Sequence, residues 1–204
     1  AEGLQDRQRS VPLSVLLKGG ATMTLHFVPV HGDQDQERLA ELAAEIWRGY
    51  WPALIGRDQT EYMIENFQSL SAIKRDMAEH GYEYWFLVAD GGEVSDEEAA
   101  SLPHGRVMGY TGGHVEPETN RFFISKIYLL PEARGHHFAS RAIGFYGALC
   151  QCRGLSAMYL TVNKGNVLGI RAYEGNGFVT IDAVETDIGN GFIMDDFIME
   201  KRVR

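Results

Sequence analysis

The chain contains little cysteine and no long apolar run. Its two cysteines, Cys150 and Cys152, are two positions apart late in a predicted helix and therefore face different ways. Neither a mutual disulfide nor a shared metal site is expected, and a reducing cytoplasmic setting is favoured. Because no stretch of about 18 apolar residues is present, we expect no membrane-spanning helix and no membrane partner.

Basic residues are outnumbered in this sequence. The chain has 19 Lys and Arg against 28 Asp and Glu, which gives a formal net charge of −9 at pH 7. A nucleic-acid partner would need a basic face, so none is expected. The acidic balance is compatible with a cationic substrate, although acidic surfaces are also common for solubility alone.

Two familiar phosphate-binding motifs are absent. There is no G-x-x-x-x-G-K-[ST] sequence and no G-x-G-x-x-G sequence after a strand, which excludes a P-loop and the Rossmann fingerprint. At 204 residues and 45% hydrophobic content, the chain suits a single globular domain with or without an appended arm.

A strand–turn–helix segment between Ile127 and Ala139 is the strongest local signal. An apolar strand ends at Pro131, a short basic turn follows, and a helix then keeps one apolar face through Leu149. The first N–H groups of a helix have no internal partners, and the helix dipole makes this end positive. With Arg134 just before it, the segment predicts a phosphate or pyrophosphate site.

A second strand–turn–helix segment follows about 30 residues later. Residues 159–162 read as a strand, 163–166 as a turn and 167–173 as a short helix. Glycines at 175 and 177 end that helix, and a further strand begins at Phe178.

These two segments together resemble the GNAT (GCN5-related N-acetyltransferase) family. Residues 134–139 are similar to its R/Q-x-x-G-x-G/A pyrophosphate loop. The second segment is similar to its N-x-x-a-x-x-x-Y-e-x-x-G-F motif through Asn166, Ile170, Tyr173, Glu174, Gly177 and Phe178. Two motifs in the family's order make chance improbable, and the resemblance covers roughly residues 24–203.

The resemblance implies an α/β (α+β) GNAT fold. It consists of a mixed, mostly antiparallel twisted sheet of about seven strands flanked by about four helices, in which strands 121–130 and 159–162 splay apart. The other strands are expected at 24–30, 84–89, 106–115, 178–181 and 197–199, and the first two helices at 36–50 and 61–79. A hairpin loop is expected at 90–105 and a tight turn at 189–191. The acetyltransferase domain would occupy 23–204, and residues 1–22 would be either a native arm or an extension ahead of a start at Met23.

Acetyl-CoA is the cofactor that the resemblance implies. The backbone N–H groups of 135–139 would bind its pyrophosphate, the Ile127 N–H would face the thioester oxygen, and Leu129 would pair with the pantetheine amides. Tyr173, which is protonated at neutral pH, would be the general acid for the leaving thiolate. The full predicted cofactor set is Ile127, Tyr128, Leu129, Arg134, Gly135, His136, His137, Phe138, Ala139, Ser140, Asn166 and Tyr173, with Ile127 and Tyr173 as the catalytic pair.

Two positions depart from the family pattern. His137 stands where a second glycine is usual, and we expect it to be tolerated inside a regular helical turn. Phe123 occupies a position that carries a carboxylate in some relatives, so the general base is left open among Glu83, Glu116, Glu118, a water chain and an amine that arrives neutral. No Cys or carboxylate lies at ligand spacing from His136 or His137, so no metal is expected.

The acceptor site is expected between the first two helices and the C-terminal hairpin. Trp47, Tyr50, Trp51 and Tyr62 would line an amine pocket through cation–π contacts, or else form hydrophobic core. The predicted activity is acetyl transfer to a primary amine of a small molecule, with a polyamine as one candidate, by direct attack in a ternary complex. The alternatives are a protein or peptide acetyltransferase and a degenerate CoA-binding sensor. A homodimer is compatible with the family.

Overall fold

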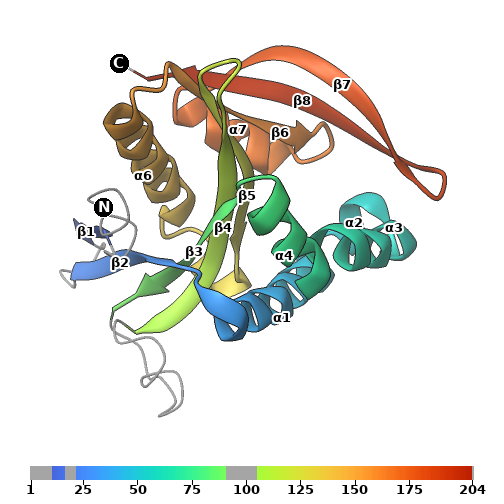
Figure 1. Cartoon of the computed structure of the whole chain (residues 1–204), viewed down its shortest axis with the longest axis horizontal. Coiled ribbons are helices and arrows are strands. Elements are labelled where there is room, and N and C mark those ends of the chain that lie inside the picture. The colour runs from blue at the N-terminus through green and yellow to red at the C-terminus, as the bar shows by residue number, and fades with distance from the viewer. Residues whose placement is uncertain (1–10, 17–21, 91–104, 204) are drawn as a thin grey trace.

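One mixed sheet organises the chain. The computed structural model describes residues 11–16, 22–90 and 105–203, so most of the predicted loop 90–105 and much of the predicted extension 1–22 lie outside the described residues. The described strands follow the order β1-β2-β3-β4-β5-β6-β8-β7 (Figure 1). Their bounds are β1 Val11–Leu16, β2 Thr22–Pro29, β3 Glu83–Ala89, β4 Arg106–Glu116, β5 Arg121–Leu129, β6 Ala157–Asn163, β7 Val179–Gly189 and β8 Phe192–Arg202.

Helices cover both faces of this sheet. Figure 1 shows α6 on one side of the central strands and α1 to α4 on the other. On the α6 side, the Phe145 ring stacks on Phe27 of β2 with 4.3 Å between centroids. The bounds are α1 Gly32–Tyr50, α2 Pro52–Ile55, α3 Arg57–Met63, the π-helix η2 Ile64–Gln68, α4 Leu70–Glu79, the 3-10 helix η3 Pro131–Ala133, α6 Phe138–Arg153 and α7 Val167–Gly175. No described helix has the length and apolarity needed to span a membrane.

The predicted GNAT fold is confirmed, including the splay of its central strands. β5 and β6 run parallel and pair only where Arg121–Phe123 meets Ala157–Tyr159. Beyond this point the register of β5 against β4 skips Ser125, which is the extra residue of a β-bulge. A bulge bends its strand and increases the local twist, so β5 turns away from β6 and leaves a free strand edge.

Among the described residues, the sheet has one strand more than was predicted. The backbone of Val11–Leu16 pairs antiparallel with β2 and forms the edge strand β1. The predicted boundary at Met23 therefore falls inside β2, whose range is Thr22–Pro29. Part of the predicted extension is continuous with the domain's sheet.

The prediction of one continuous helix over 61–79 is wrong. The chain instead forms α3, a π-helical turn over 64–68, a break at Ser69, and then α4. The Ser69 hydroxyl accepts the Ala72 N–H at 3.3 Å, so Ser69 is the N-cap of a new helix. The π turn brings Phe67 and Gln68 to the wall of the cavity described below.

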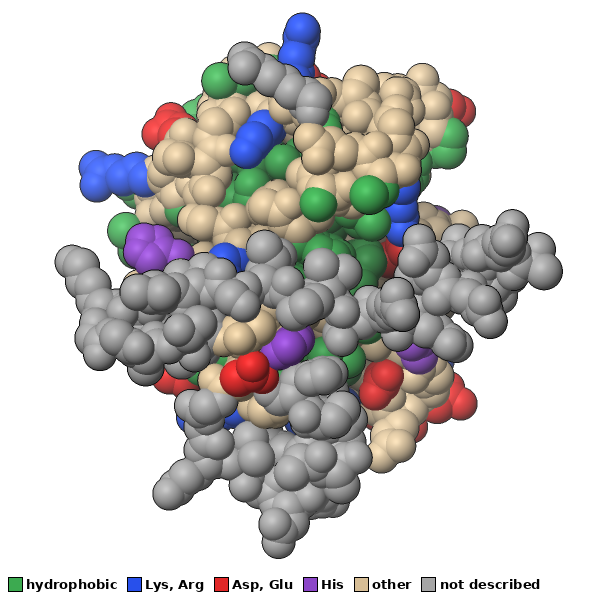
Figure 2. All heavy atoms as spheres, turned by 90° about the vertical axis from the view of Figure 1, so that its left-hand side faces the viewer, with side chains coloured by type: hydrophobic (Ala, Val, Ile, Leu, Met, Phe, Trp, Pro, Cys, Tyr) green, Lys and Arg blue, Asp and Glu red, His purple; other side chains and the backbone are tan. Residues whose placement is uncertain are grey.

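The C-terminal hairpin is longer than predicted, and its turn is the expected one. Asn190 and Gly191 have φ values of 54° and 78°, which match the left-handed conformations of a two-residue type I′ turn. β8 lies between β6 and β7, so residues from the C-terminal end of the sequence line the splay. On the face of the molecule shown in Figure 2, the visible Lys and Arg side chains lie singly and form no continuous patch.

Candidate active site

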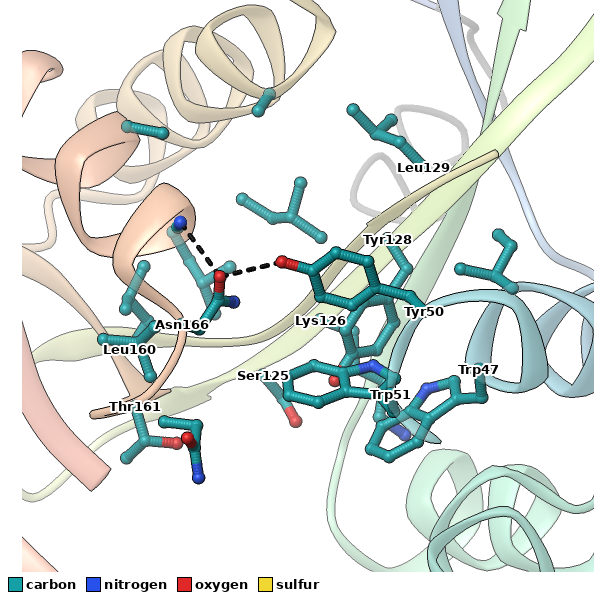
Figure 3. A pocket seen from close by; sticks show the side chains of 18 of the residues that line it. Trp47, Tyr50, Trp51, Ser125, Lys126, Tyr128, Leu129, Leu160, Thr161 and Asn166 are labelled. Carbon is teal, nitrogen blue, oxygen red and sulfur yellow. Dashed lines mark hydrogen bonds between the residues drawn. The ribbon is translucent and has the colours of Figure 1, made fainter. Parts of the chain in front are cut away.

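The free edge of β5 opens into a cavity of about 690 Å³. Its walls come from α1, the π turn, β5, the start of α6, β6, α7 and β8 (Figure 3). Of the residues predicted for the site, those that line it are Trp47, Tyr50, Trp51, Ile127, Tyr128, Leu129, Arg134, Gly135, His137, Phe138, Ala139, Ser140, Asn166 and Tyr173. His136 and Tyr62 lie outside this lining.

The ladder between β4 and β5 fixes which peptide groups face the cavity. The Leu130 N–H donates to the Met108 carbonyl of β4 at 3.0 Å. In an antiparallel ladder, alternate residues bond to the same neighbour, so the Tyr128 and Lys126 N–H groups also face β4. The N–H groups of Ile127 and Leu129 therefore point toward the edge that β6 does not occupy.

The loop before α6 has the geometry of an anion site. Gly135 and His137 have φ values of 80° and 59°, and α6 begins at Phe138. The first intrahelical bond runs from the Arg141 N–H to the His137 carbonyl at 3.1 Å, so the preceding N–H groups of α6 have no helical acceptor. The prediction that His137 lies in a regular helical turn is wrong, since it is the left-handed N-cap residue. Histidine is enriched among non-glycine residues in this conformation, which explains why the backbone accepts it.

Three residues from separate elements meet at the mouth of this loop. The Arg134 guanidinium lies 4.7 Å from the centre of the Tyr50 ring. The Tyr50 hydroxyl donates to the Asn166 side-chain oxygen at 2.9 Å (Figure 3). The same oxygen accepts the Gly169 N–H at 3.0 Å and so caps α7. Tyr50, predicted for the acceptor pocket, thus contacts two of the predicted cofactor residues.

Tyr173 projects from α7 into the cavity. Its ring packs edge-on against Phe178 with 5.7 Å between centroids. Burial, reinforced by the nearby Tyr50, raises the pKa of Tyr173 to about 12. The hydroxyl therefore keeps its proton through the neutral range and can donate it.

Aromatic side chains form the opposite wall of the cavity. The Trp47 and Trp51 rings stack at 5.0 Å, and Tyr128 meets both of them edge-on, at 5.5 Å and 6.3 Å respectively. Phe67 of the π turn packs against this cluster. Tyr62, in contrast, donates its hydroxyl to the Ile188 carbonyl at 2.6 Å and so ties α3 to the β7–β8 hairpin.

A buried lysine on β5 was not anticipated from the sequence. Lys126 is 5% exposed and donates to the Tyr84 hydroxyl at 2.7 Å. Its Nζ lies 3.4 Å from an Asp76 carboxylate oxygen, which also accepts the Tyr84 hydroxyl at 3.0 Å. Burial lowers the pKa of Lys126 to about 8, although Asp76 opposes the shift. All three side chains belong to different elements, so no local pattern marks the cluster.

A buried carboxylate on β8 was also missed. Asp196 lines the cavity, is 3% exposed, and lies opposite Asn163 of β6. Its Oδ1 atom is buried without a hydrogen-bond partner. Burial raises the pKa of Asp196 to about 6; the neighbouring Asp195 adds to the shift, whereas Thr161 and Lys164 oppose it. The pair Asp195 and Asp196, in the middle of an otherwise apolar run, was the available sequence signal.

The base candidates considered from the sequence lie elsewhere. Glu83 forms a two-bond ion pair with Arg153, and Glu116 accepts the Tyr159 hydroxyl. Neither of them, nor Glu118, lines the cavity. Phe123 does line it, with its ring stacked on Tyr159 at 4.8 Å. Within the described residues, no group of three or more His, Cys, Asp or Glu is placed to hold a metal ion.

Comparison with known proteins agrees with this geometry. A model of the acetyltransferase (GNAT) family matches residues 40–178. No curated protein matches the chain. Among solved structures, the PaiA N-acetyltransferase of Thermoplasma acidophilum, in complex with coenzyme A, is 22% identical, with a TM-score of 0.63 over 89% of this chain and 99% of that one.

Two further solved structures share the fold at lower identity. A GCN5-related N-acetyltransferase from Rhodopseudomonas palustris is 14% identical, with a TM-score of 0.64 over 86% of this chain and 94% of that one. The spermidine N-acetyltransferase of Vibrio cholerae, in complex with CoA and spermine, is 16% identical, with a TM-score of 0.56 over 89% of this chain and 95% of that one.

The family model covers well over half of the chain, so the protein belongs to the GNAT family of acetyltransferases. It is accordingly an N-acetyltransferase that uses acetyl-CoA as its acetyl donor. The residues present fit that donor, because a helix start with N–H groups that have no helical acceptor and a free strand edge open into one cavity.

Proposed function

We propose that this enzyme acetylates the primary amine of a small molecule by direct attack in a ternary complex. The observation that carries the proposal is one cavity that joins the free edge of β5 to a buried carboxylate on β8, one oxygen of which has no hydrogen-bond partner. The free edge suits an acyl thioester and the carboxylate suits an ammonium group. Direct attack is favoured because neither cysteine lines the cavity.

Each end of the cavity has a proposed task. Bound acetyl-CoA supplies the acetyl group as a thioester. The N–H groups at the start of α6, with Arg134, are proposed to hold its pyrophosphate, and Leu129 its pantetheine amides. The Ile127 N–H is the proposed donor to the thioester oxygen, a role typically worth about 3–4 kcal/mol.

Proton transfer is assigned to two side chains. Asp196, with a pKa of about 6, is largely ionised at neutral pH and is proposed to take the proton of the acceptor ammonium, directly or through a water. This replaces Glu83, Glu116 and Glu118 in that role. Tyr173, with a pKa of about 12, is proposed to donate to the leaving thiolate, whose conjugate acid has a pKa near 8.5.

The acceptor class admits more than one candidate. A polyamine is suggested by the spermidine enzyme among the structural neighbours and by the net charge of −9. A peptide amine would need a wide open groove, and the stacked tryptophans of the cavity wall disfavour it. Small monoamines are the remaining candidate acceptors, and the aromatic wall of the cavity favours them.

The decisive assay is thiol release from acetyl-CoA over a panel of monoamines, polyamines, aminoglycosides, amino acids and short peptides. We expect turnover on one class of small amine. Tyr173→Phe and Asp196→Asn should each lower kcat about 10- to 1000-fold while leaving CoA affinity within about threefold. Tight CoA binding without turnover on any amine would favour the sensor alternative, and turnover on peptides alone would favour a protein acetyltransferase.

A further inference from the structure

We infer that the acceptor is a monoamine with a flat apolar body, and that the cavity discriminates against amines carrying a second positive charge. This inference rests on the proposed function and names its substrate class. It follows from two features of the acceptor end of the cavity, namely the composition of its wall and the placement of its charges.

The wall is built to contact flat apolar groups. Trp47 and Trp51 stack, Tyr128 closes against both, and Phe67 and Met63 complete the same cluster. All five side chains line the cavity. Burying an apolar body here gains about 25 cal/mol per Å² of surface removed from water, and aromatic stacking adds about 0.5–1.5 kcal/mol.

The charged side chains of the cavity leave one carboxylate available to pair with an ammonium group. Two carboxylates line it, Asp76 and Asp196. Asp76 already lies beside the Lys126 ammonium, at 3.4 Å, and accepts the Tyr84 hydroxyl. Asp196 keeps a buried oxygen without a hydrogen-bond partner, so it can receive a donor from the acceptor amine.

A second ammonium on the same ligand would find no free carboxylate among the described lining residues. It would lose its hydration against aromatic rings, and the second lining carboxylate, Asp76, is already paired with Lys126. Cation–π contact with the rings offsets only part of that desolvation, about 0.5–2 kcal/mol. An unpaired buried charge is far more costly than this.

A matched pair of acceptors tests the charge argument directly. 2-Phenylethylamine and its ring-aminomethyl analogue share the phenylethylamine body and differ by one aminomethyl group, which adds one positive charge. Hexylamine and 1,6-diaminohexane form the aliphatic pair, and spermidine is the polyamine. We expect kcat/KM to be at least 10-fold higher for each monoamine than for its diamine, and higher for 2-phenylethylamine than for hexylamine.

Two conservative variants test the proposed roles of Lys126 and Phe67. Lys126→Gln should narrow the monoamine-to-diamine ratio of kcat/KM at least threefold, because it leaves the Asp76 carboxylate free to pair with a second ammonium group. Phe67→Leu should narrow the preference of aryl over alkyl amine and leave the monoamine-to-diamine ratio unchanged. CoA affinity, measured by calorimetry, reports that each variant is folded.

Several outcomes would overturn the inference. Equal or better turnover of the diamines or spermidine would refute it while leaving the proposed small-amine function intact. Turnover confined to peptides, or CoA binding with no turnover of any amine, would remove the proposed function and the inference together.

Discussion

The Tyr50 hydroxyl donates to the Asn166 side-chain oxygen at 2.9 Å, and this bond links the end of α1 to the cap of α7. The Arg134 guanidinium lies over the same tyrosine ring at 4.7 Å. Tyr50 therefore connects Arg134, in the loop that precedes α6, with Asn166, which lies 116 positions from Tyr50 in the chain. The predicted cofactor residues are supported by a residue that neither family motif includes.

We predict that Tyr50→Phe will weaken CoA binding about three- to tenfold and lower the free energy of unfolding by about 0.5–1.5 kcal/mol, since it removes one hydrogen bond and keeps the ring under Arg134. Calorimetry with CoA and urea unfolding measure the two effects. Tyr62→Phe is the matched control, because its hydroxyl donates to the Ile188 carbonyl outside the cavity lining. It should lose similar stability without losing CoA affinity. An equal loss of CoA affinity in both variants would contradict the assignment of Tyr50.

The local motifs of this protein could be predicted from sequence because each depends on neighbours in the chain. The Asn166 cap and the Asn190–Gly191 turn follow from short-range backbone requirements that particular residue types satisfy. The turn between β5 and α6, which is proposed to bind an anion, follows in the same way. For this reason the fold was predicted correctly, and most of the residues predicted to bind the cofactor line the cavity.

The missed residues depend on pairings between distant strands. Asp196 enters the cavity because β8 pairs with β6 and places it opposite Asn163. Lys126 finds Asp76 only because β5 packs near the end of α4, 50 positions away in sequence. Nothing in the local sequence of β5 or β8 sets these registers. The sequence alone therefore left the general base open, and Asp196 could be proposed for that role only from the strand pairing.

Asp196 predicts the acid limb of the pH–rate profile. With its pKa raised to about 6, it loses its proton as the pH rises through that value, so kcat/KM should rise through an apparent pKa near 6. Asp195→Asn should move this limb to lower pH, because it removes the neighbouring negative charge that helps to raise the pKa. Asp196→Asn should abolish the limb along with most of the activity. A limb at pH 6 that persists unchanged in the residual activity of Asp196→Asn would assign it to another group.

The raised pKa of Asp196 also predicts how the stability of the fold changes with pH. The folded pKa of Asp196 lies above the ordinary value of 3.8, so the fold favours the protonated form. The stabilising contribution of the protonated carboxyl is present below about pH 4 and is lost as the pH rises through about 6. Asp196→Asn should therefore raise the free energy of unfolding by about 1–2 kcal/mol at pH 7.5 and change it little at pH 4. Urea unfolding at both pH values measures this change in the free energy of unfolding. Destabilisation of Asp196→Asn at pH 7.5 would contradict the prediction.

Lys126 and Asp76 should behave as a coupled buried pair. Lys126→Met leaves the Asp76 carboxylate near Tyr84 without its cation and should cost about 2–4 kcal/mol. The double variant Lys126→Met/Asp76→Asn should recover at least half of that loss, because no unpaired charge remains. The exposed pair of Lys74 and Asp33 is the control, and Lys74→Met should cost less than about 0.5 kcal/mol. Additive costs in the buried double variant would show that the two side chains do not interact.

His137 provides the last prediction, since an L-residue with φ of 59° sits beside the proposed phosphate site. A β-branched side chain is strongly disfavoured in this left-handed conformation, whereas glycine adopts it freely. His137→Val should therefore lower the free energy of unfolding by about 1–2 kcal/mol, and His137→Gly should leave it within about 0.5 kcal/mol of the parent. Because glycine exposes the backbone N–H groups, His137→Gly should also bind CoA at least as tightly as the parent. Weaker CoA binding by His137→Gly would mean instead that the imidazole itself contacts the phosphates. In that case His137→Asn, whose side chain tolerates the same backbone conformation, would show the same loss of CoA affinity.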